Sequence, residues 1–522
     1  MLAYFATTVS ANAHAFAQRY DLPIPLWLNV VGAGAVVAVS FVIIGIFVHK
    51  DKEGDKLPRL ELLNTTVGRA IAHRHVLVLL RLLSVAIFVV LIVAGLFGVQ
   101  NIPEENILPT AVWVIWWIGL AFISALLGDL WSLINPWRIV AEQAASATRR
   151  LRPAGPAKSR NLPAHASVWP AVFVFAGFAW AELVWSERAV PASLSLAVIL
   201  YSLATWAGMY YAGIETWLRR GEAFSILYGL FARFARVELR IITSAHCATC
   251  GKDTCHDNDS GACIDCPACF RRASPQERRI DLRPYGVGLL TTVLPPVSVM
   301  AFVLLVLATV SFDGFGATPV WQTILNAVIA VPFIGALPGA LGMNNANGIM
   351  TTAGILLTPL IFFAVYMAFC ALIAALTRGA RSGELAGAPA QWTAMGIARV
   401  FIFTLVPIAI AYHLAHFLTL LLIFGQAIFP LASDPFGYGW NLFGTADYQV
   451  DIAIIGAQFA WFTAVIAIVI GHIVAVYLAH VMALRAFGDH AVALRSQYPM
   501  LALMVGYTMI SLWILAQPIV EA

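Results

Sequence analysis

The segment VFIFTLVPIAIAYHLAHFLTLLLIFG, residues 400–425, contains no lysine, arginine or acidic residue. About 20 mostly apolar residues suffice for a helix to cross a bilayer, so this segment is predicted to span a membrane. The pattern recurs along the chain. The predicted spans are 28–48, 76–98, 110–134, 168–186, 193–214, 287–311, 350–376, 400–425, 453–484 and 497–518. Because lipid offers no partner for unpaired backbone groups, we expect an all-α fold, a polytopic transmembrane helix bundle of about ten spans.

The composition of the whole chain agrees with this prediction. Of the 522 residues, 61% are apolar and only 11% are charged, whereas soluble domains carry about 25% charged residues. This excludes an ordinary soluble enzyme and a disordered chain. The net charge of +4 is too small to indicate nucleic-acid binding. The expected partner is the lipid bilayer.

Lysines and arginines gather in the loops on one side of the ten predicted spans. The positive-inside rule makes that side cytoplasmic, and it places both termini outside. The apolar stretch 320–341 is interrupted by Pro332 and Pro338. Counting this stretch as a span would move the later arginines outside. We therefore predict that 320–348 is an outer re-entrant segment.

Four regions follow from this order of spans. Residues 1–27 form an outer N-terminal segment; their first part, MLAYFATTVSANA, is either retained or removed as a signal peptide before His14. Residues 28–214 and 287–522 form the two parts of the bundle. Residues 215–286 form a cytoplasmic insertion. Within 213–240 apolar residues recur at helical spacing opposite arginines, which predicts an amphipathic helix in the membrane interface.

The insertion carries six of the seven cysteines of the chain. They are Cys247, Cys250, Cys255, Cys263, Cys266 and Cys269. Cytoplasmic thiols stay reduced, and two C-x2-C pairs are typical of tetrahedral zinc. The C-x2-C-x2-C spacing also resembles part of an iron–sulfur motif. We expect a metal centre, with zinc favoured over iron–sulfur, that either holds the insertion together or senses metal or redox state.

Histidines in two predicted spans are candidate metal ligands. His413 and His416 lie on one helical face, and His472 lies in the following span. Counted from Arg399 and Arg485, His413 and His472 lie about 21 Å and about 20 Å along their helices. At equal depth, three imidazoles would bind a divalent transition metal. The alternative is that these histidines bond to backbone carbonyls.

A few acidic residues also fall within or beside predicted spans. Glu182 is a candidate general base or fourth metal ligand; alternatively it pairs with Arg188 at the interface. Asp129 and Glu215 lie near inner ends of spans, where pairing with local arginines is expected. No nucleotide-binding loop, G-x-S-x-G or H-E-x-x-H motif is present in the sequence.

Six segments together resemble a bacterial membrane-protein family known as fenitrothion hydrolase. They are HAFAQRYDLPIPLW (14–27), GDLWSLINPWR (128–138), GIETWLRRGEAFSILYGLFARF (213–234), RRIDLRPYGVGLL (278–290), AYHLAH (411–416) and GHIVAVYLAH (471–480). The resemblance implies an enzyme of the bacterial cytoplasmic (inner) membrane that hydrolyses an organophosphate triester and releases a nitrophenol. The expected partner besides the lipid bilayer is therefore an apolar small molecule. A divalent ion on the histidines would activate water for this reaction. Two alternatives stay open: a metal-ion or proton transporter, and a redox subunit with an iron–sulfur cluster or haem.

Overall fold

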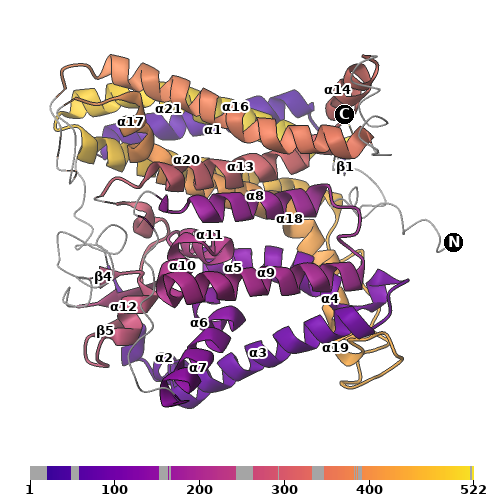
Figure 1. Ribbon diagram of the computed structural model, residues 1–522. Coiled ribbons are helices and arrows are strands. Elements are labelled where there is room, and N and C mark those ends of the chain that lie inside the picture. The colour runs from indigo at the N-terminus through magenta and orange to yellow at the C-terminus, as the bar shows by residue number, and fades with distance from the viewer. Residues whose placement is uncertain are drawn as a thin grey trace.

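The computed structural model describes residues 20–48, 58–151, 163, 166–242, 263–291, 293–331, 346–380, 383, 385, 391–517 and 520–521. These residues form a bundle of long helices, with a small sheet at one end (Figure 1). Exposed apolar side chains cover much of the bundle surface, among them Leu79, Leu200 and Leu360. Such a surface is expected of helices that face lipid.

Nine helical segments within the described residues are long and apolar enough to cross a membrane. They are α1 (Leu26–Phe47), α3 (Arg74–Phe97), α4 to α5 (Ile107–Leu126), α9 (Pro191–Ala212), α13 (Val297–Gly316), α16 (Ala346–Leu376), α17 to α19 (Ala394–Ser433), α20 (Ala457–Ala486) and α21 (His490–Ala516). Helix α8 (Trp169–Leu183) is apolar but has only 15 residues. Each of the ten predicted spans thus coincides with an apolar helical segment.

The two ends of the described chain lie at the same end of the bundle. Strand β1 (Tyr20–Asp21) pairs in parallel with β6 (Val520–Glu521). Because β1 precedes α1 and β6 follows α21, the first and last helices have their outer ends at the same end of the bundle (Figure 1). Helix α8 also runs along the bundle, between the positions of α5 and α9 in the chain (Figure 1).

The third predicted span, 110–134, is shorter than expected. Its helix includes a π-helical stretch, η4 (Ala111–Gly119), and ends at Leu126. The chain then turns at Gly128, whose φ of 154° is accessible to glycine. Two separate helices follow, α6 (Trp131–Ile134) and the amphipathic α7 (Pro136–Leu151). The sixth span also starts late, at Val297, because Pro295 and Pro296 precede it.

The prediction of one amphipathic interfacial helix over 213–240 is wrong. The segment contains two short helices, α10 (Ile214–Arg220) and α11 (Ala223–Ala232). Helix α11 packs against α5 and α8, and most of its side chains are buried, including those of Tyr228 and Leu230. The chain leaves the bundle after α11 and forms strand β3 (Val237–Ile241). Arginines that looked like one face of a helix therefore belong to a loop and a strand.

The insertion contributes three strands to a four-stranded antiparallel sheet, and residues 60–61 contribute the fourth, so the fold is mainly rather than entirely helical. The strand order is β2 (Leu60–Glu61), β5 (Arg278–Leu282), β3 and β4 (Cys263–Ile264). A buried guanidinium, Arg283, joins the sheet to the bundle. It lies 2.8 Å from Glu238 and 2.7 Å from Asp265, and its side chain is 1% exposed. On the other side of the molecule, α14 (Pro319–Ile329) starts the predicted re-entrant segment, whose residues 332–345 lie outside the described part.

Candidate functional site

An acid–base pair joins α13 to α18 (Val406–Phe424). The Nε2 atom of His416 lies 2.8 Å from Oδ2 of Asp313. The His416 side chain is buried, whereas that of Asp313 is 24% exposed. Gly314 makes the close approach of the helices feasible: a Cβ atom there would lie 2.6 Å from Oη of Tyr412 and 2.9 Å from Cγ2 of Ile514. The pair is therefore built into a tight helix contact.

A second carboxylate, that of Glu182, approaches this pair from α8. Its Oε1 accepts a hydrogen bond of 2.6 Å from Nε1 of Trp117. The Glu182 carboxylate is close enough to Asp313 and Arg188 for their charges to interact. Three helices, α8, α13 and α18, thus bring two carboxylates and one imidazole together. We call Glu182, Asp313 and His416 the acid–base cluster.

His413 lies one helical turn from His416 but in an apolar setting. Its ring centroid is 4.7 Å from that of Phe417, 5.3 Å from Trp117 and 6.0 Å from Phe231. Within the described residues, its Nε2 has no hydrogen-bond partner. His413 is therefore a neighbour of the acid–base cluster, packed among aromatic rings.

His472 does not point to the same place as the other two histidines. Its Nδ1 lies 2.8 Å from the carbonyl oxygen of Ile468, one turn back on α20, and its ring faces Tyr507 at 5.9 Å. In the described part of the chain, three ligand atoms within 4.8 Å of one another occur only among cysteines. The three histidines are thus not gathered into a shared ligand set. Equal depth in two helices does not fix their rotation about their axes.

Three cysteine sulfur atoms lie within 4.8 Å of one another, those of Cys263, Cys266 and Cys269. All three residues are buried, and none of them forms a disulfide. Cys263 lies in β4, which pairs with β3 at the edge of the sheet. Cys266 is the N-cap of α12 (Pro267–Arg272), so Cys269 follows three residues later on the same helical face. This cluster could hold a metal ion. Cys247, Cys250 and Cys255 lie outside the described residues.

Charged groups just beyond the ends of α5 and α9 form a separate network. Glu215 lies 3.0 Å from Arg138 and 2.6 Å from Arg271, which confirms its predicted pairing with local arginines. Burial raises the pKa of Glu215, but the two guanidinium groups outweigh this effect and lower it. Asp129 instead accepts a hydrogen bond from the backbone N–H of Ser132. Burial raises the pKa of Asp129 to about 6, although Ser132 and Arg138 oppose the shift.

Asp313 was not predicted from the sequence. It is the acidic residue of VSFDGFG, near the end of an otherwise uncharged span, and that isolation is the signal that could have identified it. Comparison of the chain with protein-family models, with curated proteins and with solved structures found no match.

Proposed function

We propose that the protein is a membrane-integral hydrolase of neutral organophosphate triesters, an aryldialkylphosphatase-type enzyme that cleaves the aryl P–O bond. The observation that carries the proposal is the contact between His416 and Asp313 beside Glu182, inside a bundle with an apolar surface. A neutral triester partitions into the bilayer, so it can approach such a site between helices. The resemblance to the fenitrothion hydrolase family points to the same substrate class.

The proposed chemistry is general base catalysis. The His416–Asp313 pair accepts a proton from a water molecule, and the water oxygen attacks phosphorus while the P–O bond to the aryl group breaks. The products are a dialkyl phosphate or thiophosphate and a nitrophenolate, whose stability makes a general acid unnecessary. A carboxylate hydrogen-bonded to an imidazole orients the ring and stabilises its protonated form. Glu182 is the second carboxylate, and its interaction with Asp313 would help to hold a proton within the cluster.

This mechanism differs from the metal mechanism expected from the sequence. An ion held by His413, His416 and His472 would require all three imidazoles to share it. In the proposed mechanism, the acid–base cluster does the chemistry and His472 is a helix-packing residue bonded to Ile468.

Nitrophenol release from an aryl triester by the detergent-solubilised protein tests the proposal. We expect Asp313→Asn and His416→Gln each to lower the turnover rate by roughly 10²–10⁴-fold. His472→Gln separates the two mechanisms, because only shared metal ligation predicts a comparable loss. Size-exclusion profiles show whether each variant is folded. Turnover by folded Asp313→Asn at the wild-type rate would contradict the proposal, as would the absence of triester hydrolysis in the wild type.

We further propose that the cysteine cluster binds zinc and stabilises the insertion. A tetrahedral zinc with Zn–S bonds of about 2.3 Å separates its thiolates by roughly 3.8 Å. The three sulfur atoms lie within 4.8 Å of one another, which suits one ion. In a four-iron cluster each thiolate binds a different iron, which requires wider spacing. Colourless protein with one zinc per chain, lost in Cys263→Ser, is the expected result; iron with visible absorption would favour the redox alternative.

A further inference from the structure

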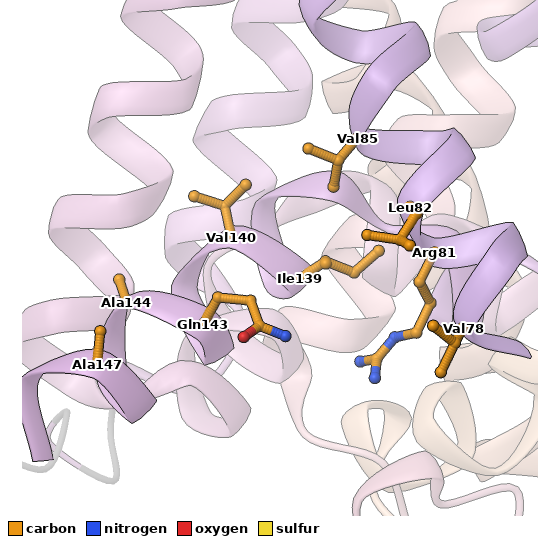
Figure 2. Close-up of a pocket in the computed structure, with 9 residues that line it drawn as sticks. All are labelled: Val78, Arg81, Leu82, Val85, Ile139, Val140, Gln143, Ala144 and Ala147. Atoms are coloured by element: carbon orange, nitrogen blue, oxygen red, sulfur yellow. The ribbon is translucent and has the colours of Figure 1, made fainter. Parts of the chain in front are cut away.

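A cleft of about 570 Å³ separates α3 from α7 at the periphery of the bundle. Val78, Leu82 and Val85 line it from α3, and Val140, Ala144 and Ala147 line it from α7 (Figure 2). Both sets follow the i, i+4, i+7 spacing of a single helical face. The two helices contact each other, and beside that contact the two apolar stripes line the walls of the open cleft. The chemistry of the walls requires an apolar occupant.

Arg81 interrupts this apolar lining near one end. Figure 2 shows the guanidinium of Arg81 and the carboxamide of Gln143 extending between the two helices. One Arg81 nitrogen lies 2.5 Å from Oε2 of Glu142. Within the described residues, Nε of Arg81 is buried and has no hydrogen-bond partner. Buried hydrogen-bond donors normally have an acceptor, so the Nε atom of Arg81 is expected to bind one. A guanidinium group is well matched to the oxygen atoms of a phosphate.

The position of Arg81 matches the depth of a lipid headgroup. It lies seven residues after Arg74, the first residue of α3, hence about 10 Å along the helix axis. A long arginine side chain reaches from such a depth toward the headgroup level. Because α3 is a candidate membrane span, the cleft opens where acyl chains are expected.

We propose that this cleft is a binding site for one phospholipid with a zwitterionic phosphoethanolamine headgroup. An acyl chain fills the space between the two apolar stripes. The phosphodiester accepts hydrogen bonds from Arg81, and the ammonium group lies against Glu142. A headgroup with only a negative charge would gain the first contact but meet repulsion from the Glu142 carboxylate, so the ion pair selects the zwitterion.

Native mass spectrometry of the detergent-purified protein tests this site, with phosphatidylethanolamine and phosphatidylglycerol of identical acyl chains as probes. We expect the wild type to bind phosphatidylethanolamine about tenfold more tightly than phosphatidylglycerol. Arg81→Gln should weaken its binding about tenfold. Glu142→Gln should remove the preference, because the phosphatidylglycerol headgroup then meets no opposing carboxylate.

A larger side chain placed in the cleft provides an independent test of lipid binding. Ala144→Phe should weaken the binding of both lipids, whereas Leu79→Phe should not, since Leu79 is 65% exposed on α3 and does not line the cleft. Melting temperatures identify variants that fail to fold. Equal retention of the two lipids by the wild type, a preference that survives Glu142→Gln, or equal effects of Ala144→Phe and Leu79→Phe would each overturn the proposal. None of these readouts depends on hydrolysis.

Discussion

The carboxylates of Glu182 and Asp313 are held by donors from other helices. Trp117 donates to Glu182, and Asp313 contacts His416. A charge removed from water is tolerated only when partners compensate it, so such residues in a bundle mark functional sites more often than packing sites. Arg188 supplies further positive charge to both carboxylates. Two acids, one imidazole and one guanidinium thus form a compensated set.

Asp129 should make the stability of the protein depend on pH. Its pKa is raised by burial from the usual 3.8 to about 6, so the folded state binds a proton that the unfolded state has lost. Stability from this group is therefore highest below about pH 4, falls as the pH rises toward 6, and is constant above. We expect Asp129→Asn to be more stable than the wild type at pH 8, by about 1–3 kcal/mol.

Thermal melting followed by tryptophan fluorescence at pH 4 and pH 8 measures this difference. Asparagine keeps an oxygen that can accept the hydrogen bond from Ser132, so the comparison isolates the charge. The gain in melting temperature should be present at pH 8 and absent at pH 4. The same gain at both values would assign it to something other than ionisation.

Single residues also show which parts of the candidate site could be predicted from the sequence and which could not. Glu182 was identified because an acid in an apolar span is conspicuous, and its carboxylate interacts with that of Asp313. The depth of His472 was estimated from arginine spacing, but depth says nothing about rotation, and its ring turned toward Ile468 and Tyr507. Asp313 was missed because the predicted span ends at residue 311, just before it.

At the scale of elements, α18 and α20 make one of the closest contacts of the bundle. A Cβ atom on Gly471 would lie 2.4 Å from Cβ of Ala411 and 2.9 Å from the carbonyl oxygen of Pro407. The missing side chain therefore lets two long helices touch, as small residues do in membrane proteins. This contact sets how α18 presents His413 and His416.

Gly471→Ala should force α18 and α20 apart. Overpacking of this kind costs about 1–3 kcal/mol, so we expect a lower melting temperature and, if the proposed function holds, slower nitrophenol release. Gly506→Ala is the matched control, because no atom lies within 4 Å of a Cβ built at that position of α21. Similar melting temperatures for the two variants would show that the contact between α18 and α20 is looser than described.

Hydropathy located the long helices well, because a span needs a fixed length of apolar sequence. It did not find the sheet of the insertion. Strands β2 and β4 have only two residues each, too few for an alternating pattern, and their partners come from distant parts of the chain. Hydropathy also extended the predicted span 110–134 over α6, although the chain turns at Gly128 before that helix begins. Local composition determines whether a segment is buried in lipid, but not where short elements meet.

At the scale of the whole molecule, the pairing of β1 with β6 and the position of the sheet define two ends of the bundle. Strand β1 contacts α20 near its start, so the loop that precedes α20 lies at the end where β1 and β6 pair. The arginine-rich insertion lies at the opposite end (Figure 1). The positive-inside rule would make the insertion end cytoplasmic.

Accessibility of engineered cysteines should show this orientation. Gln449 precedes α20 and Gln276 lies in the insertion, and both are exposed. With a membrane-impermeant maleimide on intact spheroplasts, we expect labelling of Gln449→Cys but not of Gln276→Cys, and labelling of both after lysis. The unaltered chain measures the background from its own cysteines. Labelling of Gln276→Cys alone in intact cells would mean an inverted protein, and it would place the cysteine cluster in an oxidising compartment where disulfides compete with zinc.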